Sequence, residues 1–154
     1  HRARLAAAGG FLTERNCVYR LLIASVALAL GAPIAATEPV TGRWLTEEKT
    51  GVVEIAPCGA NLCGTIVRVI GSQRDVGDLR DANNPNAALR NRRIVGLPIL
   101  TGFTRRDGAW RGRIYDPNSG KSYRSIIGLG ANGRLEVKGC VGPFCQTQIW
   151  TRAR

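Results

Sequence analysis

Two cysteine pairs of identical spacing constrain the fold more than any other feature of this chain. Cys58 and Cys63 enclose Gly-Ala-Asn-Leu, and Cys140 and Cys145 enclose Val-Gly-Pro-Phe. Two cysteines at facing strand ends across a four-residue turn can meet the geometry of a disulfide. We therefore predict two local disulfides, Cys58–Cys63 and Cys140–Cys145, each within a β-hairpin of a protein from an oxidising compartment.

Four cysteines could instead form a tetrahedral zinc site, which is the alternative to two disulfides. An oxidising compartment favours disulfides over thiolate ligands. A redox-active pair is less compatible with the spacing, because thioredoxin-type chemistry uses Cys-x-x-Cys at the start of a helix. We expect structural disulfides, no metal and no cofactor.

The N-terminal region has the pattern of a secretory signal. Arg20 precedes an apolar run over 21–30, and small residues fill 31–36. The run is shorter than the roughly 20 apolar residues that a membrane span needs. We expect a signal peptide over 18–36, cleaved after Ala36 or Ala35. Residues 1–17 are interpreted as an over-extension upstream of a true start at Val18.

A mature domain of residues 37–154 would be periplasmic or secreted, without a transmembrane segment. The whole chain carries 22 basic and 11 acidic residues. Residues 1–36 hold four of the basic and one of the acidic residues, so the mature domain keeps a net charge of +8. Its length suits a single domain. Covalent staples become necessary for stability only below roughly 70–80 residues, and this domain is longer.

Short segments of alternating hydrophobicity fill most of the mature domain. Asp107-Gly108 and Asn132-Gly133 between such segments are strong hairpin signals. Eight strands are expected, at Arg43–Thr46, Val52–Ala56, Thr65–Ile70, Pro98–Thr104, Ala109–Tyr115, Ser122–Leu129, Arg134–Cys140 and Gln146–Arg152. Eight is the number at which a small up-and-down barrel closes, either filled by side chains or holding one small ligand. We predict an all-β, antiparallel eight-stranded barrel.

One long insertion, over 71–96, interrupts the regular turns. A polar stretch leads to Asn84-Pro85, a pattern typical of a helix N-cap followed by proline at the first helical position. We expect a short helix there, ending before Gly96. Long insertions on short-turned scaffolds often carry function. The alternative is that Leu89 simply covers an open end of the barrel.

Several motifs resemble known families. Gly42-x-Trp44 is similar to the first-strand motif of lipocalin-like (calycin) barrels, in which a late arginine packs over the tryptophan; Arg152 matches that arginine. The wider pattern resembles the secreted bacterial DUF2147 family of unknown function over essentially all of 40–152. It comprises Ile55-x-x-Cys58-Gly59-x-x-Leu62-Cys63-Gly64, Asn84-Pro85, Trp110-x-Gly112-x-Ile114-Tyr115-Asp116-Pro117-x-Ser119-Gly120-Lys121-x-Tyr123 and Gln148-x-Trp150-Thr151-Arg152. The resemblance implies a small envelope protein with a lipocalin-like barrel and no established activity; Cys140 and Cys145 lie outside this pattern.

The residue content does not favour an enzyme. His1 is the only histidine, so the mature domain has none for Ser-His-Asp or Cys-His catalysis. Asp75, Asp78 and Asp81 recur every three residues, but neighbouring arginines favour salt bridges over a calcium site. Asp116–Gly120 is interpreted as a structural turn, because each of its residue types has a turn role. We expect no catalytic residues.

The basic residues suggest an anionic partner. Nucleic acid is disfavoured by export and by the lack of interleaved stacking aromatics. We expect a small apolar or amphipathic anionic, lipid-like ligand that enters at the barrel end covered by residues 71–93. Arg90, Arg92 and Arg93 would hold its head, beside Leu89. The alternative is an envelope interaction protein with a filled barrel, whose basic surface contacts an anionic envelope surface.

Overall fold

The computed structural model describes residues 39–71 and 78–154. The expected signal peptide (18–36), the segment upstream of it (1–17) and Asp75 lie outside the described residues. Within the described part, no helix has the length and apolar character to cross a membrane. Residues 35–154 form a compact unit of their own.

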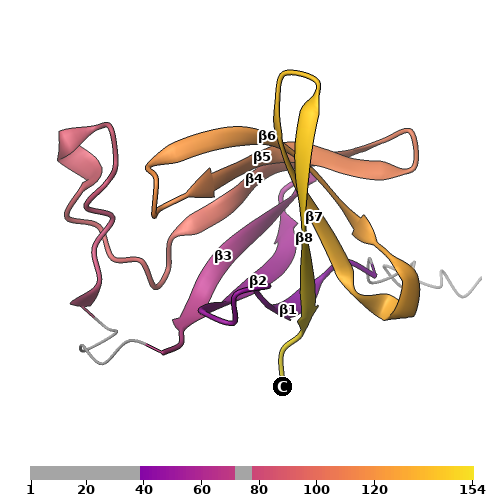
Figure 1. Cartoon of the computed structure of the whole chain (residues 1–154), viewed down its shortest axis with the longest axis horizontal. Helices are drawn as coiled ribbons and strands as arrows, with labels where there is room; N and C mark the ends of the chain where they lie inside the picture. Colours follow the sequence, from indigo (N-terminus) through magenta and orange to yellow (C-terminus); the bar gives the residue numbers. More distant parts are fainter. Residues whose placement is uncertain (1–38, 72–77) are drawn as a thin grey trace, which may run out of the picture. The chain divides into compact units, whose positions relative to one another are not determined.

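Eight antiparallel strands close into a barrel in simple sequence order (Figure 1). The strands are β1 (Gly42–Leu45), β2 (Gly51–Cys58), β3 (Asn61–Val69), β4 (Pro98–Arg106), β5 (Ala109–Asp116), β6 (Lys121–Leu129), β7 (Leu135–Val141) and β8 (Phe144–Arg152). Each strand pairs with the next, and β1 pairs with β8 at Trp44–Arg152 and Leu45–Thr151. The predicted all-β, eight-stranded up-and-down barrel is confirmed.

The predicted hairpin signals form tight turns. Asp107 and Gly108 both have positive φ, as a two-residue type I′ connection requires. Burial alternates along the strands that follow, so Leu135 and Val137 are buried and Glu136 is partly exposed. Because side chains alternate across a strand, this pattern places one face of each strand in the barrel interior.

The antiparallel order gives the barrel two different ends. The closed end carries the β2–β3, β4–β5 and β6–β7 turns together with residues 39–41 and Arg152. The open end carries the β1–β2, β5–β6 and β7–β8 turns and the long connection between β3 and β4. We call residues 70–97 of that connection the insertion.

Aromatic side chains fill the closed half of the barrel. Trp44, Phe103 and Trp150 are almost fully buried, and Leu135 and Ile127 pack among them. Gly112 on β5 makes room for Phe103, since a Cβ at this position would overlap the ring. The largest core side chains therefore lie toward the closed end, and the smaller Val53, Ile66 and Ile99 extend the same buried cluster toward the open end.

Arg152 covers the outer surface of this core, as the sequence predicted. Its guanidinium carbon lies 3.9 Å from the centre of the Trp44 ring. Its two terminal nitrogens donate to the carbonyl oxygens of Thr41 (2.6 Å) and Pro39 (2.7 Å). The Trp44 indole donates to the Val40 carbonyl at 2.9 Å. One arginine thus joins the last strand, the first strand and the segment that precedes it.

Both expected disulfides are present, with Cα separations of 5.7 Å for Cys58–Cys63 and 4.0 Å for Cys140–Cys145. The expected four-residue turns are wrong in detail. Strand pairing continues past the cysteines to two-residue turns, and Cys58 pairs in register with Asn61. Cys140 and Cys145 lie directly opposite each other. Some of the residues between each pair of cysteines continue the strands, because further pairing satisfies their backbone hydrogen bonds.

The expected helix in the insertion is a short 3₁₀ turn over Ala87–Leu89. Its cap is Asn86, whose side chain accepts a hydrogen bond from the Ala88 amide at 3.1 Å. Asn84, the expected cap, instead accepts from the Asn86 amide at 2.9 Å. The side-chain amide of Asn84 donates to Asp81 Oδ2 and to the Tyr115 hydroxyl, and the turn begins two residues later than predicted.

Candidate functional site

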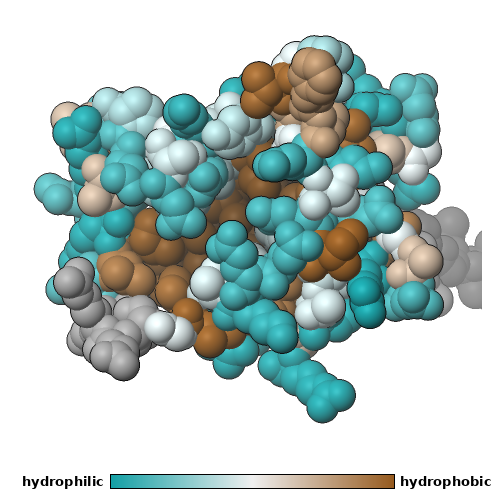
Figure 2. All heavy atoms as spheres, viewed as in Figure 1, coloured by the Kyte–Doolittle hydropathy of each residue, from teal (hydrophilic) through white to brown (hydrophobic). Residues whose placement is uncertain are grey.

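The open end of the barrel contains a cavity of about 370 Å³. Its wall is mainly apolar and comes from strands around the barrel, with Trp150 among the lining residues. The principal apolar lining side chains are Val53, Ile66, Val69, Ile94, Ile99 and Ile114. Figure 2 shows an apolar hollow on the viewed face, bordered by hydrophilic side chains.

A second hollow of about 450 Å³ continues from the first along β5 to β8. The two share Ile114, Asp116 and Gln148 in their walls. Gly139 lines the second hollow, and a Cβ there would meet only Ile114, at 3.9 Å. The absence of a side chain at this inward position leaves room inside the barrel.

The hollows exist because β1 is short. It pairs with β8 only at Trp44 and Leu45, so β8 continues toward the open end without a β1 neighbour. Gln146 and Gln148 take inward positions on this stretch and are nonetheless exposed. The barrel wall is therefore incomplete on this side, and its inward positions are open to solvent there.

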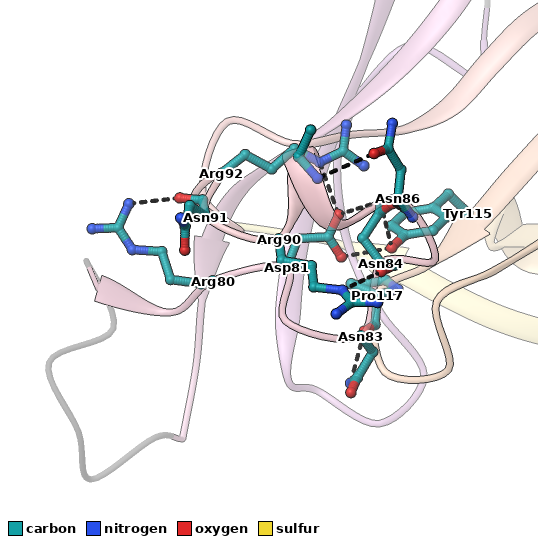
Figure 3. Close-up of polar contacts among 11 residues, drawn as sticks. Arg80, Asp81, Asn83, Asn84, Asn86, Arg90, Asn91, Arg92, Tyr115 and Pro117 are labelled. Carbon is teal, nitrogen blue, oxygen red and sulfur yellow. Dashed lines mark hydrogen bonds and ion pairs between the residues drawn. The ribbon is translucent and has the colours of Figure 1, made fainter.

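The insertion is fastened to the barrel by one buried carboxylate (Figure 3). Asp81 is fully buried. The Tyr115 hydroxyl on β5 donates to its Oδ1 at 2.6 Å, and Asn84 Nδ2 donates to its Oδ2 at 2.8 Å. Arg92 Nε also donates to Oδ2 at 2.8 Å. Two donors from the insertion and one from β5 therefore satisfy one buried charge.

Charge and hydrogen bonding decide the ionisation of this group. Burial acts to raise the pKa of Asp81, but the hydrogen bonds from Tyr115, Asn84 and Arg92 and the charge of Arg92 outweigh it. The pKa of Asp81 is therefore below its ordinary value. Burial, followed by the hydrogen bond to Asp81 and its negative charge, raises the pKa of Tyr115. At neutral pH the pair is a carboxylate bound to a phenol.

The β5–β6 turn provides a second attachment for the insertion. Asn83 Nδ2 donates to the carbonyl oxygens of Asn118 (2.9 Å) and Pro117 (3.3 Å). Gly120 has a φ of 69°, and a Cβ there would overlap the Asn83 carbonyl. The turn interpretation of Asp116–Gly120 is confirmed by the Ser119–Asp116 hydrogen bond of 2.6 Å. The sequence did not predict that this turn binds Asn83 of the insertion, because a local motif does not reveal its distant partner.

The four residues expected to bind a ligand lie on the insertion but do not line either hollow. Arg92 bonds Asp81, and Arg90 Nε donates to the Asn84 carbonyl at 2.8 Å. Arg93 pairs through its backbone with Arg80 and is exposed, as is Leu89. These residues lie at the open end of the barrel, and their binding role stays a prediction.

The rim of the first cavity has a mixed charge. Glu48, Asp116 and Arg80 are its charged members. Arg80 is partly committed, because it pairs with Asp78 at 2.7 Å and donates to the Asn91 carbonyl at 3.0 Å. Among the described residues, no group of three or more His, Cys, Asp or Glu side chains could hold a metal ion. The rim offers hydrogen-bonding groups around an apolar opening.

The family model of DUF2147, described as an uncharacterized protein conserved in bacteria, matches residues 42–152. The chain belongs to the DUF2147 family. This match covers every strand of the barrel and confirms the family resemblance. No curated protein matches the chain.

A solved structure has a fold similar to that of this chain. It is protein HP1028 from the human pathogen Helicobacter pylori, described as belonging to the lipocalin family. The match has a TM-score of 0.65 and 24% sequence identity, and it covers 77% of this chain and 85% of that one. At this identity the similarity concerns the fold, which is a lipocalin-like barrel.

Proposed function

We propose that this protein is a non-enzymatic carrier that holds a small apolar or amphipathic molecule in the open end of its barrel. The cavity with an apolar wall and a polar rim is the observation that carries the proposal. Small-molecule sites typically combine a mostly apolar surface with a few polar groups that orient the ligand. A lipocalin-like fold is compatible with this use, because an eight-stranded barrel is wide enough for one small ligand.

An amphipathic ligand fits the cavity better than a fully apolar one. Its tail would lie against Ile66, Ile99 and Ile114, where it would be removed from water. Its head would remain at the rim and on the adjoining insertion. Arg90 and Arg92 use only their Nε atoms in the hydrogen bonds described above, and Arg93 is exposed. We propose that these guanidinium groups favour an anionic head.

The alternative of a filled barrel applies to one half of the molecule. The closed half is packed with aromatic side chains, whereas the open half keeps a cavity of about 370 Å³. The cavity is the observation that favours a carrier over a purely structural envelope protein.

The test is a binding titration with a fluorescent fatty acid on protein comprising residues 37–154, which contain the whole closed barrel. We expect wild-type protein to bind and Gly139→Leu to bind at least about tenfold more weakly, because the new side chain would project toward Ile114, which lines both hollows, and would take up space beside the ligand. Gly128→Leu is the matched control. Gly128 is on the neighbouring strand at an outward position, where an added Cβ would meet no atom within 4 Å. Equal affinity in all three proteins would contradict the cavity as the binding site.

The anionic preference has its own test. Arg90→Gln/Arg92→Gln/Arg93→Gln is compared with wild type for binding of a fatty acid and of its uncharged alcohol. We expect weaker binding of the acid alone. If both ligands weaken equally, the arginines support the fold of the insertion and do not select an anion.

Export is a further part of the proposal. Two disulfides are compatible with an oxidising compartment. We propose cleavage of the chain after Ala36 and release into the periplasm or the medium. N-terminal sequencing of the protein recovered from the periplasm tests this directly; a start upstream of residue 30 would contradict it.

A further inference from the structure

The tip of the β7–β8 hairpin is the most exposed apolar feature of the described residues. Phe144 is 80% exposed and Val141 is 66% exposed. They are a cross-strand pair, and the Cys140–Cys145 disulfide joins the next pair along the hairpin. Figure 2 shows apolar and weakly polar spheres at this projecting tip. A single exposed apolar side chain needs no explanation, but a covalently braced pair at a tip calls for one.

Two arginines lie on the outer face of the barrel, on the two strands that precede the hairpin. Arg124 pairs in register with Cys140, and its guanidinium donates to the carbonyl of Gly142 at the tip. Arg113 lies opposite Arg124 on the neighbouring strand. Neither forms an ion pair with an acidic side chain of the described segments. Like charges directly opposite each other destabilise a sheet, so an anionic partner would relieve their repulsion.

The tip is also continuous with the barrel interior. Val141 and Phe144 are among the residues that line the second hollow, together with Gly139. An apolar strip therefore leads from the tip along the inner face of β7, past Gly139 to Val137, while Gln146 and Gln148 line the facing side on β8. The basic pair lies on the outer face of the same region, so apolar and cationic surfaces meet at one edge of the open end.

We propose that the β7–β8 tip inserts into the surface of an anionic phospholipid bilayer, with Arg113 and Arg124 bound to headgroup phosphates. Phe144 and Val141 enter the boundary between headgroups and acyl chains. The open end of the barrel then faces the membrane. This inference concerns the hairpin surface alone, so it stands or falls independently of the carrier function.

The size of the patch favours a bilayer over a protein partner. A stable protein interface removes about 800 Å² from each partner, which two side chains cannot supply. Membrane docking requires much less apolar area, because each basic residue near an anionic surface adds to the attraction. Arginine is suited to phosphate, since its planar fork can donate two hydrogen bonds to one group.

The experiment is vesicle flotation with protein comprising residues 37–154, which excludes the apolar segment 21–30. One set of vesicles contains phosphatidylglycerol and phosphatidylcholine in equal parts, and the other contains phosphatidylcholine only. We expect flotation with the first set, reduced by added salt because salt screens the arginines, and little with the second. Absence of binding to the anionic vesicles at low salt would overturn the proposal and leave the tip to a protein partner.

Matched variants separate the tip from general basicity. Phe144→Ser should reduce the partition coefficient at least about tenfold. Arg113→Gln and Arg124→Gln should each reduce it about fivefold. The controls lie at the closed end: Leu129→Ser, an apolar residue that is 42% exposed, and Arg106→Gln/Arg134→Gln. If the control variants lose as much binding as the tip variants, the attraction is nonspecific and the proposal is wrong.

A second measurement reports insertion itself. Tryptophan placed at the tip by Phe144→Trp should shift its emission to the blue and be quenched by brominated lipid in anionic vesicles. Leu129→Trp at the closed end should show neither change. The same response from both positions would overturn the assigned orientation, even if the protein binds the vesicles.

Discussion

The two ends of the barrel have different interiors, although side chains alternate between inward and outward positions at both. At the closed end, inward positions carry Trp44, Phe103 and Leu135, which fill the space between the strands. At the open end, inward positions carry Gly139, Gln146 and Gln148, which leave it hollow. Packing at one end stabilises the barrel enough for the other end to remain unfilled. The difference shows that dense packing and open space can be separated along a barrel only a few residues deep.

The largest expected effect compares core residues from the two ends. Trp44→Ala should lower the free energy of unfolding by about 4 kcal/mol, because it leaves a large void in a packed region. Ile99→Ala, on the cavity wall, should lower it by about 2 kcal/mol, since its surroundings are already hollow. Urea denaturation of both variants measures the difference. Equal losses would mean that the open end is as tightly packed as the closed end.

The second effect tests how the insertion is attached. Asp81→Asn should cost about 3 kcal/mol at neutral pH, because Tyr115 and Arg92 lose a charged acceptor in a buried position. Asp78→Asn is the control: its ion pair with Arg80 is exposed, so a change below about 0.5 kcal/mol is expected. Hydrogen exchange of the insertion amides should increase in Asp81→Asn alone. Uniform exchange across the barrel would contradict a local role.

The pH dependence of this attachment follows from the lowered pKa of Asp81. The stabilisation is present above the ordinary carboxyl pKa of about 4 and is lost as pH falls through the lower, folded pKa. The stability difference between wild type and Asp81→Asn should therefore be constant from about pH 5 to 8 and shrink below about pH 4. At high pH, the raised pKa of Tyr115 predicts a loss of stability once pH exceeds about 10. A flat difference across the acidic range would contradict the charged form of Asp81.

The third effect compares the two disulfides. Replacing either pair by serine should cost about 2 kcal/mol, as expected for a short closed loop. The local effects of the two replacements should differ, because the two disulfides lie at opposite ends of the barrel. Cys58→Ser/Cys63→Ser affects the packed end and should leave the open end unchanged. Cys140→Ser/Cys145→Ser should increase hydrogen exchange at the β7–β8 tip. A barrel that unfolds completely on removal of either pair would show that the core alone is insufficient.

The smallest effect concerns the arginine at the closed end. Arg152→Ala should lower the free energy of unfolding by about 1–2 kcal/mol, because the stacking on Trp44 and the hydrogen bonds to Thr41 and Pro39 are lost. Tryptophan fluorescence should change at the same time. Arg154→Ala, two residues later, is the control and should alter neither property. An unchanged denaturation midpoint and spectrum in Arg152→Ala would contradict the contact.

Local sequence patterns were enough to predict the strands, the hairpins and the two disulfides. Alternating hydrophobicity and Asp-Gly or Asn-Gly turns act over roughly two to ten residues, so they can be seen in the chain itself. The Trp44–Arg152 contact could also be predicted, because closure of the barrel brings its first and last strands together. Asn84 could not be predicted from local patterns. Its sequence context is typical of a helix cap, but its side chain donates to Asp81 and to the Tyr115 hydroxyl.

The sequence by itself determined an antiparallel eight-stranded barrel with two braced hairpins, because those features depend on neighbours along the chain. Only the tertiary structure decided which arginines support the insertion, that Gly120 receives Asn83, and that the barrel is packed at one end and hollow at the other. These outcomes depend on contacts between residues far apart in the chain, such as Asp81 with Tyr115. Burial and hydrogen bonding at such distances are set by how the closed barrel brings its strands and loops together, and no local pattern specifies that arrangement.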